Sequence, residues 1–158
     1  MAAALFLIAG VCLLEAQTDL KTYKLESMET LRTVHARLLK TDSANDRAKD
    51  FQVSGGMLRY RLSVQYLDSI RVIRDEIEDI CGYWADNVLQ NETMREEYKH
   101  EILVRAGERA YWVPIKESVL GRFKIEMKKG SRTFVYMTLI GSHFDDLIFS
   151  IDDFRKAE

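Results

Sequence analysis

His143, Asp145 and Asp146 are the side chains in this sequence best suited to acid–base or metal chemistry, and they lie together in GSHFDD at residues 141–146. An imidazole beside two carboxylates can bind a cation or act as a general acid and base. Apolar runs flank the segment, which predicts a loop between two strands. We therefore expect either a histidine–carboxylate site at this loop or a solvated hairpin loop without a chemical role.

Aromatic and basic residues are interleaved in the C-terminal part, and four of them predict a binding surface: Trp112, Lys124, Arg132 and Tyr136. Rings on a sheet can stack on planar groups of a sugar or nucleic acid, while cations hold negative charge. Tyr111 and Trp112 must face opposite sides of their strand, so at least one of the two is expected in the core. The alternative interpretation assigns all of these rings to the core.

No other motif in the chain points to catalysis or to a cofactor. The glycines never form a phosphate-binding GxGxxG or GxxxxGK[ST] pattern, and no GxSxG segment is present. The two cysteines, Cys12 and Cys81, exclude a zinc site built on CxxC pairs. Cys81 lies among apolar residues and is expected to be a buried thiol. We predict no cofactor.

Composition favours an ordinary globular domain. The chain has 158 residues, 47% of them hydrophobic, and a formal net charge of −2. Proteins that bind nucleic acids broadly carry a basic excess that neutralises phosphates, so nucleic acid is not an expected partner.

The opening segment MAAALFLIAGVCLLEAQTD predicts export. Residues 2–14 are free of charge. They are too few for a transmembrane helix, which needs about 20 apolar residues, so we expect no transmembrane span. The length suits a signal peptide covering residues 1–16 and cut after Ala16, although no Lys or Arg precedes the apolar run and Leu14 is large for its position. The alternative is an uncleaved apolar segment buried in the core or held against a membrane or partner.

Residues 17–97 are expected to be mainly helical. Met28, Leu31, Val34 and Leu38 recur every three or four residues, which predicts a helix over residues 20–39. Residues 57–66 alternate as a half-buried strand would, yet they run into apolar positions at helical spacing that reach Trp84. We interpret this stretch as a second helix from about Arg59, packed antiparallel to the first.

Residues 98–158 are expected to be rich in strands. Residues 102–105 and 110–115 predict two strands around a turn, and residues 116–127 a short helix. Residues 132–141 form the strongest predicted strand, residues 147–151 a last strand, and residues 152–158 a polar tail.

The sequence thus predicts one α+β domain over residues 17–158. Its fold would be an antiparallel helical pair followed by a sheet of about four strands, which could curl into an open OB/SH3-like barrel. The predicted function is a small exported, non-catalytic binding or scaffold protein of the cell envelope or periplasm. Its partner would be a protein or an envelope polymer, bound through the C-terminal sheet. The alternatives are an enzyme using the loop at residues 143–146 and an intracellular OB-like nucleic-acid binder.

Overall fold

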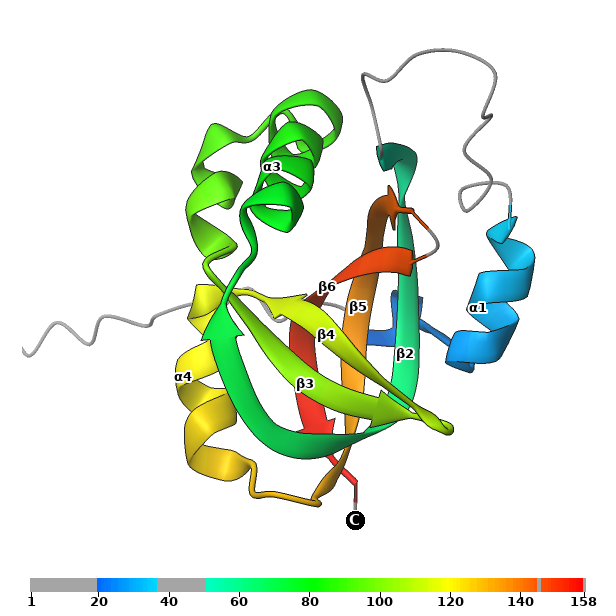
Figure 1. Cartoon of the computed structure of the whole chain (residues 1–158), viewed down its shortest axis with the longest axis vertical. Coiled ribbons are helices and arrows are strands. Elements are labelled where there is room, and N and C mark those ends of the chain that lie inside the picture. Colours follow the sequence, from blue (N-terminus) through cyan, green and yellow to red (C-terminus); the bar gives the residue numbers. More distant parts are fainter. Residues whose placement is uncertain (1–19, 37–50, 145, 158) are drawn as a thin grey trace, which may run out of the picture.

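The structure, a computed structural model, describes residues 20–36, 51–144 and 146–157, and about half of these residues belong to one mixed sheet of six strands (Figure 1). The strands are β1 (Lys24–Leu25), β2 (Phe51–Val72), β3 (His100–Ala106), β4 (Arg109–Ile115), β5 (Arg132–His143) and β6 (Asp146–Lys156). The helices and single helical turns are η1 (Leu20–Thr22), α1 (Met28–Val34), α3 (Asp75–Trp84), η2 (Ala85–Leu89), η3 (Glu92–Glu97) and α4 (Glu117–Glu126).

Five strands form a closed ring of pairings in the order β2, β3, β4, β6, β5 and back to β2. The long strand β2 permits this because it changes partner: residues 51–65 pair with β5, and residues 65–72 pair with β3. The ring closes between β4 and β6 through one parallel pair, Ile115 with Ile151. In Figure 1, β3 and β4 cross in front of β5 and β6. We call the outer face of β3, β4 and the end of β2 the front wall, and the outer face of β5, β6 and residues 59–65 the back wall.

The predicted helical pair is wrong. Of residues 20–34 of the predicted first helix, only α1 is α-helical; it begins after Ser27, whose Oγ accepts the N–H of Thr30 as an N-cap. Residues 37–39 of the predicted helix lie outside the described residues. The second helix does not begin at Arg59, because that residue lies inside β2. The alternating pattern prevails there because β5 and β3 supply hydrogen-bond partners along this stretch, and the helix begins only at Asp75.

The predicted sheet of about four strands, with its open barrel, is also wrong, since the sheet has six strands and recruits residues 51–72 from the part expected to be helical. The elements expected after residue 101 are confirmed as strands and a helix in the predicted order. All four strands are longer than predicted. β5 continues to His143, and β6 extends through most of the segment expected to be a polar tail.

The main core fills the ring. Its inward residues alternate along the strands, as Leu62, Val64, Ile102 and Val104 do. Helix α4 contributes Val119, Leu120 and Phe123 to this core, and α1 contributes Met28 and Leu31. Figure 1 shows these two helices on opposite sides of the barrel. Both helices are too short to be stable in isolation, so their stability comes mainly from this burial of apolar side chains.

A second core lies under α3. Ile77, Ile80 and Trp84 of this helix pack with Ile140 and Ile148 from β5 and β6. Cys81 is buried in the same cluster, and burial raises the pKa of its thiol. A neutral, enclosed thiol behaves as a small apolar side chain, as the sequence predicts.

The end of α1 makes the fold sensitive to acid. The Nε2 atom of His35 lies 2.7 Å from the Tyr60 hydroxyl, and burial lowers the pKa of this imidazole below its ordinary value of 6.5. The folded state therefore binds a proton at His35 less readily than the unfolded state. Its contribution to stability is present above pH 6.5 and falls as the pH drops through the lower folded pKa. Urea unfolding across this range should show a smaller acid loss for His35→Gln than for the parent chain; parallel curves would contradict the assignment.

Candidate functional site

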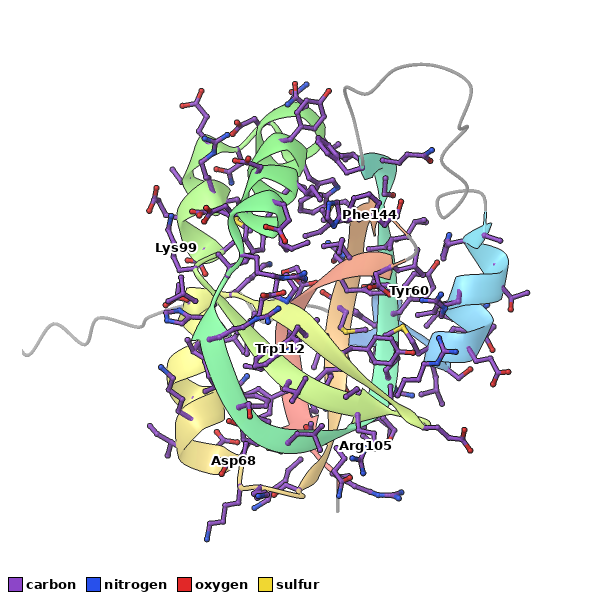
Figure 2. All side chains as sticks on the ribbon, in the orientation of Figure 1. Tyr60, Asp68, Lys99, Arg105, Trp112 and Phe144 are labelled. Carbon is purple, nitrogen blue, oxygen red and sulfur yellow. The ribbon has the colours of Figure 1, made fainter. Side chains whose placement is uncertain are left out.

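The four residues predicted to form one binding surface lie on three different parts of the fold. Trp112 is half-buried on β4 and faces outward on the front wall, where Figure 2 shows it near the middle of the sheet. Arg132 is exposed at the start of β5 on the back wall, and Lys124 is exposed on α4. Tyr136 also points toward the back wall, but only 3% of it is exposed. These four side chains therefore do not form one contiguous patch.

Tyr136 is covered by the segment that precedes α1. The ring of Tyr23 stands edge-on to it with the centroids 5.4 Å apart, and the guanidinium of Arg59 lies 5.6 Å from the Tyr23 ring. The Tyr23 hydroxyl donates a hydrogen bond to Asp152. Burial raises the pKa of this hydroxyl well above its usual range, and the Asp152 carboxylate adds to the shift. Tyr136 is thus a packing residue beneath this segment.

Asp152 is the centre of a polar cluster at the edge of the back wall. One carboxylate oxygen accepts hydrogen bonds from Tyr23 (3.0 Å) and from the Thr138 hydroxyl (2.6 Å). The other lies 2.7 Å from Nζ of Lys116, and only 7% of the Asp152 side chain is exposed. These three donors satisfy a carboxylate that burial would otherwise destabilise. The cluster ties the segment before α1, strand β5 and the start of α4 to β6.

On the front wall, charged side chains contact one another and the ring of Trp112. The guanidinium carbon of Arg71 lies 4.0 Å from the centre of the Trp112 ring, which is within cation–π range. Nε of Arg71 also donates to Oε2 of Glu101 over 2.8 Å, and Arg74 lies 3.5 Å from the same carboxylate. Glu101 is fully buried. We call Arg71, Glu101 and Trp112 the front-wall stack.

The local backbone explains how Arg71 reaches Trp112. The pairing of β2 with β3 shifts between Tyr66 and Ile70, and Asp68 within this shift has a φ of 64°. Aspartate tolerates this left-handed conformation better than most residues. An irregularity of this kind re-aims the side chains that follow it. Arg71 comes directly after it and lies opposite Glu101.

The back wall carries a second group that the predicted list captures only through Arg132. Phe134 is half-buried there, with the guanidinium carbon of Arg61 5.4 Å from its ring centre. Arg155 is paired directly opposite Phe134 on β6, and Arg132 is two residues away on β5. We call Arg61, Arg132, Phe134 and Arg155 the back-wall cluster. Arg61 comes from β2, far away in the sequence, which is why sequence reasoning missed it.

The loop predicted to hold a histidine–carboxylate site has other contacts. The ring of His143 is half-buried and its centre lies 4.3 Å from that of Phe144. The Asp146 carboxylate is exposed and lies 3.5 Å from Arg32 of α1. Asp145 is outside the described residues. In the part of the chain that the structure covers, no group of three histidine, cysteine or acidic side chains could hold a metal ion. The site stays a prediction.

A cleft on the described surface is separate from both walls' aromatic groups. It has a volume of about 660 Å³ and lies between α1 and the turn joining β3 to β4. Its lining mixes Glu29 and Arg32 of α1 with Glu108, Arg109 and Tyr111 of the hairpin. Because both signs of charge are present, the cleft has no clear preference for one class of ligand.

No helix among the described residues is long and apolar enough to cross a membrane. Neither a protein-family model nor a curated protein matches this chain.

Proposed function

We propose that this protein is a small, non-catalytic binding or scaffold protein exported to the cell envelope, and that it binds a protein partner on the front wall. The observation that carries this proposal is the front-wall stack, in which a buried glutamate holds Arg71 over the half-buried Trp112. Tryptophan and arginine are the residues most enriched at the energetic centres of protein interfaces.

The chemistry of the stack supports a docking role. Enclosing the Glu101 carboxylate costs free energy, which its pairing with Arg71 offsets only in part. What the pairing provides is a guanidinium held in one place beside an aromatic ring, so that little side-chain freedom remains to be lost on binding. Leu103, half-buried and directly opposite Trp112 on β3, extends the apolar surface. The stack thus has the apolar centre and oriented cation that a partner could use.

Truncating Trp112 should weaken partner binding at least about tenfold, because loss of a central interface tryptophan commonly costs 2 kcal/mol or more. Trp112→Ala and the parent chain would be immobilised and exposed to an envelope extract. Each captured protein would then be purified, and its affinity for both chains measured by calorimetry.

Phe144→Ala is the matched control, since Phe144 is an aromatic residue 58% exposed at the β5–β6 turn. It should bind as the parent does. Thermal unfolding must show that both variants are folded. Equal affinity of folded Trp112→Ala and the parent chain for every captured protein would refute the front-wall site.

Export is proposed from the opening segment, which lies outside the described residues. Mass spectrometry of the native protein should find a mature chain that begins at Gln17. A native chain that retains residues 1–16 would remove the support for a cleaved signal peptide, while leaving the front-wall proposal open to its own test.

A further inference from the structure

The back-wall cluster concentrates positive charge that no carboxylate in the described part of the chain neutralises. Among the described residues, Arg61, Arg132 and Arg155 form no ion pair with a carboxylate. Most other arginines and several lysines there do have an acidic partner. The back wall is therefore locally cationic, although the whole chain has a net charge of −2.

The nearby acidic residues are already engaged. Asp153 lies on β6 opposite Tyr136, and its carboxylate pairs with Arg122 of α4. Asp152 pairs with Lys116 and accepts hydrogen bonds from Tyr23 and Thr138. Both carboxylates thus have cations of their own, and the three arginines remain available to an anion from outside the protein.

The strand register sets the spacing of these cations. Same-face neighbours along a strand are about 7 Å apart, and directly opposed residues on adjacent strands about 5 Å apart. Arg132 and Phe134 are neighbours of the first kind, and Phe134 and Arg155 of the second. Arg61 is opposite Tyr136 and so lies diagonal to Phe134. The three cations therefore surround one ring but come from three strands, which suits several anionic groups along a chain better than a single small anion.

Each guanidinium offers a planar fork of N–H donors that matches the two free oxygens of a phosphodiester. The Phe134 ring in the middle supplies apolar contact for the carbon atoms that link successive phosphates. Because the guanidinium of Arg61 lies over this ring, it occupies the position where a nucleic-acid base would stack. The arrangement therefore favours a polymer recognised by its backbone rather than by its bases.

We propose that the back-wall cluster binds a linear phosphodiester polymer of the cell envelope through its phosphates. The site is distinct from the front wall and does not depend on the partner proposed there, but the envelope source of the polymer rests on the proposed export.

The binding assay uses three probes of similar length: synthetic poly(glycerol phosphate), oligothymidylate and polyglutamate. The folded chain should bind poly(glycerol phosphate) as tightly as oligothymidylate or more tightly, and polyglutamate at least about tenfold more weakly. Affinity should fall with salt, with a slope of about −2 in the logarithms for three phosphate contacts to a single strand.

Arg132→Gln with Arg155→Gln should lower the affinity for poly(glycerol phosphate) at least about tenfold and flatten the salt dependence, since two charge-assisted contacts are removed. The matched control is Arg105→Gln with Arg109→Gln, which removes the same charge from two exposed arginines of the β3–β4 hairpin. Figure 2 shows Arg105 on that hairpin side of the molecule. The control should bind within about twofold of the parent.

Arg132→Lys with Arg155→Lys serves as a second test that keeps the charge and removes the forks; it should bind between the parent and the glutamine variant. Three results would overturn the proposal. They are tighter binding of oligothymidylate than of poly(glycerol phosphate), equal binding of polyglutamate, and equal losses in the two glutamine double variants. The first would indicate a nucleic-acid site, the second a carboxylate partner, and the third a non-specific effect of net charge.

Discussion

Replacing Gly141 with alanine should destabilise the fold by about 3 kcal/mol or more, one of the two largest effects expected from a single change in this chain. A Cβ atom at this position would lie 2.0 Å from the backbone oxygen of Gln52 and 3.0 Å from Cα of Val53. Both contacts are to backbone, so no side-chain rotation can relieve them. Strand β5 pairs with β2 on one side of Gly141 and with β6 on the other, which prevents it from moving aside.

Gly121→Ala provides the matched control. Gly121 is an exposed position of α4 where an added Cβ meets nothing within 4 Å. Alanine restricts the unfolded chain and favours the helix, so this variant should gain about 0.5 to 1 kcal/mol. Urea unfolding followed by circular dichroism would measure both changes. A Gly141→Ala variant as stable as the parent would show that β2 and β5 do not approach each other this closely.

The strand β2 shows why the structure of residues 51–72 could not be predicted from the sequence. Residues 57–66 alternate, but the apolar positions from Leu67 to Trp84 also fit a helix. The structure divides this pattern: Ile70 packs in the ring, whereas Ile73 and Ile77 belong to the second core under α3. The division depends on pairing with β3 and β5, whose residues are distant in the sequence, and no local pattern reports it.

The later strands could be predicted because their signals are local. The turn at residues 106–109 separates two extended runs, and Gly107 has a φ of 62°, which a glycine adopts without strain. Alternation also correctly separated Tyr111, which packs against the main core, from Trp112, which faces outward.

The local sequence pattern could not predict which of the candidate site residues are exposed and which are buried. Phe134 and Tyr136 share a face, as their spacing requires, yet Tyr136 is buried because Tyr23 covers it. The guanidinium of Arg71 lies over the Trp112 ring, and Arg71 in turn donates a hydrogen bond to Glu101. Each of these contacts joins residues that are distant in the sequence and that only the tertiary fold brings together. Sequence patterns could therefore identify residue types suited to binding, but could not show which of them are neighbours.

Asp152→Ala should lower the free energy of unfolding by about 3 to 5 kcal/mol, the usual cost of removing one partner from a buried ion pair. The change leaves Lys116, which is 22% exposed, without its carboxylate, and removes the acceptor used by Tyr23 and Thr138. Asp153→Ala is the matched control one residue away. Its partner Arg122 is 48% exposed, so this variant should lose no more than about 1 kcal/mol.

Asp152→Ala should also release the segment before α1, because the hydroxyl of Tyr23 is hydrogen-bonded to Asp152. Tyr23→Phe keeps the edge-on ring contact with Tyr136 and should lose only about 1 kcal/mol. If Asp152 acts through this hydroxyl, the combined variant should lose less than the sum of the two single losses. Limited proteolysis at Lys21 and Lys24 should then be faster in Asp152→Ala than in Asp153→Ala. Strict additivity together with equal cleavage would mean that Asp152 stabilises the barrel only through Lys116 and Thr138, and that packing on Tyr136 alone holds the segment in place.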